Sequence, residues 1–405
     1  MKRILIIQPW IQLGGAEIAS IHLALALMRR GHSAAIACTY VDAHGLPDQA
    51  RSLDYRLPLR PLAELCRRSR PFFLLFGSWL LLLTVMRAAK GADVLNPHNF
   101  PSAWIAVLVG KLRGIPVIWT CNEPPERPRL RELRSIGPAN ALGWLLASSP
   151  LDRFLSSKVD AVYTLSERTR RQIRRRYGRN AEVLRPGIDE DLYRNGRGLD
   201  LPAGLDLAGK FVLLTVGKLH PQKNQIAAIG ALERLLPDIP NLVLLLAGDG
   251  PMRREWEQYV EEHGLGQHTC FLGSVPRAAM PTLYSCCNLN LFTPINQSWG
   301  LTPFEALLMG RVSVVSNDSG AAEVIAARSI GLVCEPSAGE VADCIVEVHS
   351  GPDRYRAMAE RGRDYVATEL TWDEHADGFL QMVARIDLKA VRSKLLSVPG
   401  GTSLR

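Results

Sequence analysis

Short apolar, β-branched runs alternate with helical patterns along this chain. The first run, RILIIQ, is followed by the amphipathic pattern AEIASIHLALALMRRG, and the strand-like run SAAIACTY comes next. Strands that alternate with helices form βαβ units, whose parallel strands are covered on both faces by the crossover helices. The alternation therefore predicts an α/β fold built on a doubly wound parallel sheet.

The alternation occurs twice, on the two sides of the Gly-rich segment NGRGLDLPAGLDLAGK. A chain of 405 residues is also too long for one ordinary hydrophobic core. We therefore predict two doubly wound domains that face a cleft, with ligands beyond the carboxyl ends of the strands. The predicted parts are an N-terminal domain over 1–190, a linker over 191–209, a C-terminal domain over 210–370, a last helix over about 371–390 that completes the N-terminal domain, and a loose tail over 391–405.

The chain is basic, with 48 Lys and Arg against 40 Asp and Glu and a net charge of +8. This excess suits an anionic partner, such as a nucleotide phosphate, a nucleic acid or an acidic membrane surface. The Arg-dense pattern SERTRRQIRRRYGR indicates a solvated surface helix, or alternatively a site for an anionic membrane or a polyanionic glycan. Since no aromatic residues are interleaved with these arginines for base stacking, we expect no nucleic-acid partner.

The eight cysteines are scattered and form no CxxC pair. Their spacing indicates neither a zinc site nor a disulfide framework, so no metal is expected and a reducing cytoplasm is the simplest compartment. The N-terminal MKRILIIQPW has a short apolar run before Pro9, which indicates a buried first strand rather than a signal peptide. We expect a cytoplasmic protein, with peripheral attachment to the inner face of the membrane left open.

The most apolar segment is PFFLLFGSWLLLLTVM, residues 71–86. The residues after its proline are fewer than the ~18–20 that cross a bilayer. One interpretation is a core helix. The other is a helix that dips into a membrane surface while its arginines meet lipid phosphates. The basic residues that flank this segment are Arg67, Arg68, Arg70, Arg87 and Lys90.

The first predicted strand ends in QPWIQLGGAE, where Gly14 and Gly15 precede a helix. Glycine lets a ligand approach the backbone closely, and a helix N-terminus offers unpaired N–H groups to a phosphate. A plain tight turn is the alternative. The pattern is not GxGxxG, and no acidic residue ends the second strand, so a dinucleotide cofactor is not favoured.

The strand FVLLTVG is followed by KLHPQKNQ, which places Lys218 and Lys223 on one turn. Two lysines at a strand end can offset the charge that grows on a leaving diphosphate, although a solvated pair is the alternative. The next strand ends in Gly248, Asp249 and Gly250. These residues indicate mostly a loop, with a backbone contact to a nucleotide base as a further possibility.

The segment SWGLTPFEALLMG predicts a helix with Thr302 at the N-cap, Pro303 at the first helical position and Glu305 two residues later. Thr302 and Glu305 then form a capping box, in which each side chain bonds a backbone N–H. The carboxylate of Glu305 can instead accept the two hydroxyls of a ribose. Both roles are compatible with one helix start.

The motifs GGAE, GKLHPQKN, AGDGP and QSWGLTPFEALLMG, in this order, resemble those of the family 4 glycosyltransferases. The resemblance covers nearly the whole chain. It implies the GT-B fold and transfer of a sugar, with retention, from a UDP, GDP or ADP sugar to a saccharide or lipid-linked acceptor in polysaccharide biosynthesis. It also implies that no metal or other cofactor is required.

The resemblance assigns roles by position. Lys218 and Lys223 would hold the donor diphosphate, Glu305 would bind the ribose, and Gly15 would touch a phosphate. His98, at the end of the strand ADVLNPH, would touch the donor sugar, and an ordinary surface or satisfied histidine is the alternative. The candidate catalytic residues are His98, Gln297 and Glu305. On the acceptor side, Asn122 and Glu123 lie after IPVIWT, where many family members carry a histidine.

Gln297 departs from the family pattern, which often has Glu both here and at the position of Glu305. An amide still forms hydrogen bonds but cannot offset the positive charge of an oxocarbenium-like centre. A carboxylate nucleophile at this position is therefore excluded, whereas retention on one face of the sugar remains possible. The departure leaves two alternatives to a transferase: a non-catalytic nucleotide-sugar-binding partner in glycan assembly, and a nucleotide-sugar epimerase.

Overall fold

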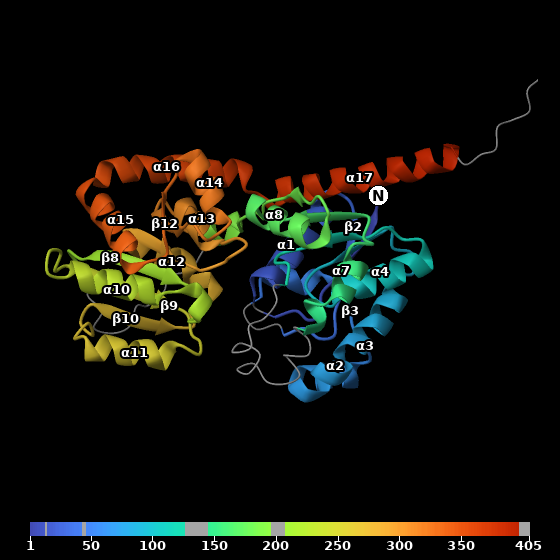
Figure 1. The fold of residues 1–405 in the computed structure, drawn as a ribbon, viewed down its shortest axis with the longest axis horizontal. Coiled ribbons are helices and arrows are strands. Elements are labelled where there is room, and N and C mark those ends of the chain that lie inside the picture. Colours follow the sequence, from blue (N-terminus) through green and yellow to red (C-terminus); the bar gives the residue numbers. More distant parts are fainter. Residues whose placement is uncertain (13, 43–45, 126–144, 196–206, 397–405) are drawn as a thin grey trace, which may run out of the picture. The chain divides into compact units, whose positions relative to one another are not determined.

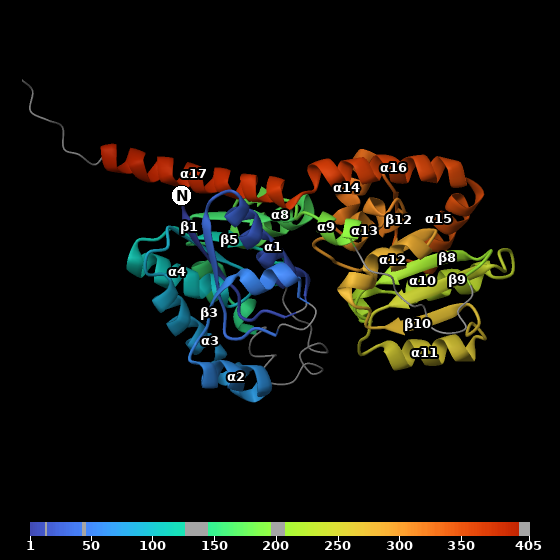
Figure 2. The same cartoon turned by 180° about the vertical axis from the view of Figure 1, so that it is seen from behind.

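The computed structural model describes residues 1–12, 14–42, 46–125, 145–195 and 207–396. These residues divide into two compact units. Unit 1 comprises residues 1–165, 169–185 and the C-terminal segment from 372, and unit 2 comprises residues 166–168 and 186–371. Each unit is an α/β structure with its own parallel sheet (Figures 1 and 2).

Unit 1 carries seven strands among its described residues. They are β1 (Arg3–Ile7), β2 (Ser33–Ala37), β3 (Asp54–Arg56), β4 (Val94–Pro97), β5 (Ile118–Thr120), β6 (Ala161–Thr164) and β7 (Glu182–Val183). Its helices are α1 (Gly15–Arg29), η1 (Asp48–Ser52), α2 (Arg60–Arg68), α3 (Arg70–Ala88), α4 (Ser102–Arg113), α7 (Pro150–Ser156), α8 (Glu167–Tyr177) and α17 (Trp372–Leu396).

The strands of unit 1 run in the order β3-β2-β1-β4, and bridges from β4 to β5 continue the parallel sheet into β5-β6-β7. One face of the sheet packs against α1 and α17, through Leu23, Leu27 and Phe379 among others. The other face packs against α3, α4 and α8, through Leu81, Val109 and others. The strand order reverses between β1 and β4, and such a switch point is where ligands bind in open α/β sheets.

Unit 2 carries six parallel strands among its described residues, in the order β10-β9-β8-β11-β12-β13. The strands are β8 (Phe211–Val216), β9 (Leu242–Ala247), β10 (Thr269–Gly273), β11 (Leu289–Phe292), β12 (Val312–Ser316) and β13 (Leu332–Cys334). The helices are α9 (Glu190–Asn195), η2 (Pro221–Lys223), α10 (Ile226–Leu235), α11 (Arg253–Glu262), η3 (Arg277–Ala279), α12 (Met280–Cys286), α13 (Thr302–Leu308), α14 (Ala321–Arg328), α15 (Ala338–Ser350) and α16 (Pro352–Glu369). Here the order reverses between β8 and β11, so the loops after these two strands lie at the switch point.

The strand-like runs that the sequence predicted are confirmed as strands in both units. Three short strands, β3, β7 and β13, were missed. The C-terminal helix α17 continues to Leu396, six residues beyond the predicted 390. Unit 2 begins at Pro186 rather than after a linker, because Ile188 N donates to Leu370 O at 2.9 Å and α9 packs against α12. Most of the predicted linker, residues 196–206, and the end of the predicted tail, 397–405, lie outside the described residues.

The Arg-dense segment is α8, with Ile173 and Tyr177 buried and Arg170, Arg171 and Arg174 exposed. It is therefore a surface helix with one packed face. All eight cysteines are free. Within the residues that the structure describes, no helix is long and apolar enough to cross a membrane.

Candidate functional site

The two lysines predicted at the end of β8 lie on one short loop. Lys218 follows the strand after Gly217 and is exposed, whereas Lys223 ends η2 and is half-buried. The side-chain amide of Gln225 donates to the carbonyl oxygens of Gly217 and Lys218, at 3.4 and 3.2 Å. The beginning of this lysine loop, residues 218–223, is therefore held by the helix that follows it.

The lysine loop contacts the loop after β11, on the other side of the switch point. Ile295 N donates to Gln222 O at 2.8 Å, and Lys223 Nζ donates to Gln297 Oε1. Gln297 is itself held by its backbone, whose N–H donates to Asp318 O at 3.0 Å. The structure thus joins two predicted residues that are 74 positions apart in the sequence.

Positive charge is concentrated at the lysine loop. The pKa of His220 is lowered first by burial and then by the charges of Lys218 and Lys223, which therefore lie close enough to repel a third cation. The amide of Gln297 accepts a hydrogen bond from Lys223 but carries no charge, whereas a carboxylate at this position would neutralise the lysine. The loop can bind an anion at the carboxyl end of β8.

The predicted capping box at the start of α13 is wrong. Leu301 occupies the N-cap position, and no side chain caps the helix. The hydroxyl of Thr302 has no hydrogen-bond partner among the described residues, and Glu305 Oε2 instead accepts a hydrogen bond from Tyr284 Oη at 2.8 Å. The helix begins one residue earlier than predicted, which turns Glu305 toward α12 instead of its own backbone.

Glu305 lies among polar side chains that the sequence analysis did not identify. The rings of Tyr193 and Tyr284 lie beside it, with centroids 6.1 Å apart, and Arg277 is nearby and paired with Asp189 at 2.9 Å. Burial raises the pKa of Glu305, while the charge of Arg277 and the tyrosine hydroxyls oppose this shift. A carboxylate has about four lone-pair sites, so acceptor capacity remains for the hydroxyls of a ligand.

The glycines after β9 are explained by contact between two backbones. Gly248 has φ +144°, and a Cβ there would lie 2.0 Å from Gly217 O. A Cβ on Gly250 would lie 2.2 Å from Leu219 O, and Leu219 N donates to Asp249 O at 3.1 Å. The loop after β9 therefore packs against the start of the lysine loop, and the predicted contact with a nucleotide base stays a prediction.

At the switch point of unit 1, α1 begins at Gly15 with Gly14 as its N-cap. Neither glycine has a positive φ, so the backbone conformation here does not require glycine, as a tight turn of the kind given as the alternative would. A Cβ on Gly15 would meet no described atom within 4 Å, whereas one on Gly14 would lie 2.4 Å from Glu17 Oε2. The buried carboxylate of Glu17, whose pKa is raised by burial, thus covers Gly14, and Gly15 is the more open of the two.

His98 follows β4 at the same switch point, and its ring is buried, with 2% exposed. Nε2 lies 2.8 Å from Asn96 Oδ1 and 3.1 Å from Thr120 Oγ1. Burial, and secondarily His375, lowers the pKa of His98 to about 3. The ring is therefore neutral at physiological pH, and Nδ1 has no hydrogen-bond partner among the described residues.

The predicted acceptor-side residues follow β5. Glu123 is exposed, and Asn122 is half-buried with a side-chain nitrogen that has no hydrogen-bond partner in the described part of the chain. Residues 126–144, which come soon after these two, lie outside the described residues. The acceptor role of Asn122 and Glu123 stays a prediction.

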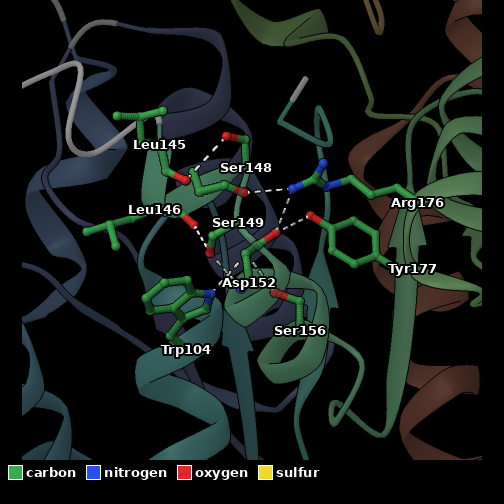
Figure 3. Close-up of polar contacts among 10 residues, drawn as sticks. Trp104, Leu145, Leu146, Ser148, Ser149, Asp152, Ser156, Arg176 and Tyr177 are labelled. Carbon is green, nitrogen blue, oxygen red and sulfur yellow. Dashed lines mark hydrogen bonds and ion pairs between the residues drawn. The ribbon is translucent and has the colours of Figure 1, made fainter. Parts of the chain in front are cut away.

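A buried carboxylate in unit 1 was missed entirely. The side chain of Asp152 is 5% exposed and accepts hydrogen bonds from Trp104 Nε1 at 2.9 Å, Tyr177 Oη at 2.7 Å and Ser156 Oγ at 3.1 Å (Figure 3). Arg176 Nη2 forms an ion pair with Asp152 Oδ2 at 3.3 Å. Because its donors come from α4, α7 and α8, Asp152 ties three helices together. No local sequence pattern indicates this cluster, because Arg176, Tyr177 and Trp104 lie 24, 25 and 48 positions from Asp152 in the chain.

Two family models match the chain: "Glycosyltransferase Family 4" over residues 13–192 and "Glycosyl transferases group 1" over residues 203–365. The alpha-1,3/1,6-mannosyltransferase ALG2 of Mus musculus is 25% identical over 95% of this chain and 96% of its own length. A GDP-mannose-dependent alpha-(1-6)-phosphatidylinositol monomannoside mannosyltransferase of Mycobacterium tuberculosis is 26% identical over 57% of this chain, and the match spans 64% of that relative.

The crystal structure of Anabaena Alr3699/HepE in complex with UDP has the same fold. Its TM-score is 0.73 at 19% identity, over 95% of this chain and 100% of that one. This likeness, with the strand orders of units 1 and 2, establishes the GT-B fold of two Rossmann-like domains. Because the two family models together match most of the chain, the protein belongs to family 4 of the glycosyltransferases.

Proposed function

We propose that this glycosyltransferase moves a sugar from a nucleoside-diphosphate sugar to a saccharide or lipid-linked acceptor, with retention and without a required metal. The observation that carries the proposal is the lysine loop at the switch point of unit 2, where Lys218 and Lys223 gather beside the loop after β11. Similar proteins include mannosyltransferases, one of them GDP-mannose-dependent by name, and a structure that binds UDP.

The lysines supply the charge that the leaving group needs. Negative charge grows on the diphosphate as the glycosidic bond breaks, and fixed cations aimed at it stabilise the transition state more than the ground state. Lys223 is held beside the loop after β11 by its hydrogen bond to the neutral amide of Gln297. Glu305, with acceptor sites left after its bond to Tyr284, would fix the ribose.

Gln297 also bears on the stereochemistry. A retaining enzyme that uses a covalent intermediate needs a carboxylate close to the anomeric carbon. A side-chain amide is not such a nucleophile, so a double displacement through residue 297 is excluded. We infer instead that the acceptor attacks from the face that the diphosphate leaves, and that a phosphate oxygen takes the acceptor proton.

The proposal is tested first by isothermal titration with UDP, GDP and ADP sugars. We expect one class to bind, and Lys218→Ala to weaken that binding about tenfold or more, because one charge-assisted contact to phosphate is lost. Folded protein that binds none of the three classes would overturn the proposal. Turnover that persists in EDTA, with an α product from an α donor by NMR, would support metal independence and retention.

A second candidate function is favoured by Gln297 alone, namely a nucleotide-sugar-binding partner without catalysis. It predicts the same donor binding and the same effect of Lys218→Ala. The two candidates separate in a turnover assay on saccharide and lipid-linked acceptors. Donor binding without transfer to any acceptor, and without hydrolysis, would favour the non-catalytic partner.

A further inference from the structure

The helix α3 exposes large apolar side chains on its outer face. Leu75, Phe76 and Trp79 are 74%, 47% and 58% exposed. The opposite face of the same helix packs into the core of unit 1 through Leu81 and Val85. The inner face therefore fits the core-helix interpretation, whereas the outer face is apolar and is not covered by the described residues.

The neighbouring helix α4 also exposes large apolar side chains. It packs against α3 in the helix layer on one side of the sheet (Figure 1). Its Leu108 and Leu112 are 48% and 66% exposed. The C-terminal ends of the two helices are joined by a hydrogen bond from Arg113 Nη2 to Met86 O at 2.7 Å. We name the exposed set the α3–α4 face: Leu75, Phe76, Trp79, Leu108 and Leu112.

The charges of these two helices have one sign. Neither α3 nor α4 contains an acidic residue, and both carry basic residues near their ends. Arg87 near the end of α3 is exposed, as are Lys111 and Arg113 near the end of α4. An apolar surface rimmed by cations complements a layer of hydrocarbon beneath anionic headgroups.

We propose that the α3–α4 face docks onto an anionic lipid bilayer. Exposed Trp, Phe and Leu side chains gain about 25 cal/mol per Å² when they leave water, and each basic residue near an anionic surface adds about 1 kcal/mol. A second copy of this chain fits the face less well. A two-fold contact places the same surface on both sides, so the cations of one copy would approach those of the other.

The test is co-sedimentation of the full chain with vesicles. We expect binding to vesicles of equal parts phosphatidylglycerol and phosphatidylcholine at low salt, release at high salt, and little binding to phosphatidylcholine alone. The variant Leu75→Ser/Trp79→Ser should lower the partition coefficient about tenfold or more, because two large apolar contacts are removed. Arg87→Gln/Lys111→Gln should flatten the salt dependence.

The matched control is Leu388→Ser, at a leucine of α17 that is 68% exposed but lies outside the face. Its binding should equal that of the unaltered protein. If the double variant is unstable, Leu75→Ser alone keeps the test valid, because this side chain contributes little to the core. The proposal is overturned if the protein does not bind anionic vesicles at low salt, or if Leu388→Ser loses as much vesicle binding as the double variant. It is also overturned if light scattering shows a dimer that Leu75→Ser disrupts.

Discussion

Replacing Gln297 with Glu changes one charge at the lysine loop and leaves the shape of the side chain nearly the same. In the structure, Lys223 Nζ donates to the amide oxygen of Gln297, and this hydrogen bond positions the lysine. A carboxylate in this place would form an ion pair with Lys223. It would also repel a bound diphosphate directly, so both effects weaken the binding of the donor.

The size of the effect follows from Coulomb's law. Two unit charges at ~4 Å interact by about 4 kcal/mol at an effective dielectric constant near 20. Lys223 is half-buried, and solvent screening reduces the loss of binding free energy for the diphosphate to about 1 kcal/mol. We therefore expect Gln297→Glu to raise the Kd for the nucleoside diphosphate about five- to tenfold. The same ion pair should leave the free energy of unfolding unchanged or slightly higher.

Isothermal titration with the nucleoside diphosphate measures this Kd directly, and single-turnover kinetics separate it from the chemical step. Gln297→Ala is the control, because it removes the hydrogen bond to Lys223 without adding charge, and it should weaken binding less than Gln297→Glu. In a Lys223→Ala background the effect of Gln297→Glu should shrink. A Kd that stays the same or falls in Gln297→Glu would refute this account of the lysine loop.

Three further predictions concern stability. Gly248→Ala should lower the free energy of unfolding by about 3 kcal/mol or more, because φ is +144° and an added Cβ has no room. The control is Gly266→Ala, whose Cβ would meet no described atom within 4 Å and which should not cause this loss. Chemical denaturation measures both variants. Asp152→Ala should cost about 3–5 kcal/mol in the same assay, since it leaves buried donors without a partner, and a loss below 1 kcal/mol would contradict the role given to it. The pKa values of His98 and His375 fall to about 3 and about 4, below the ordinary value of 6.5, so the unfolded chain binds more protons between these values. Stability should then be full above pH 6.5 and fall as pH drops toward 4, by up to about 1.4 kcal/mol per pH unit for each histidine, and His98→Gln should flatten the curve measured by urea titration.

The sequence allowed most of the long strands to be predicted, because buried parallel strands such as LVLLLA are continuous apolar runs. It did not reveal β3, β7 and β13. These strands have two or three residues each and are defined by pairing with a neighbour, which a local pattern does not contain. The predicted capping box failed for a related reason: Thr302 and Glu305 have the right spacing, but a tyrosine from α12 takes the carboxylate.

Some residues of the candidate site could likewise be predicted from the sequence, and others could not. Lys218 and Lys223 were predicted because they lie close after a strand, and strand ends can be read from the sequence. Gln297 was singled out because it departs from the pattern of the family that the chain resembles. Tyr284, Arg277 and Asp152 were not found, because their significance depends on partners that the fold brings together from distant positions.

The sequence by itself determined the fold class and the edge of each sheet where chemistry can occur, since hydrophobic periodicity and glycine placement act locally along the chain. The tertiary structure alone decided what surrounds particular side chains. Lys223 contacts a neutral amide, Glu305 contacts two tyrosines, and one face of α3 is left exposed by the described residues. The physical reason is that electrostatic interactions and burial depend on distance in space, and a sequence specifies that distance only after the sheets have formed.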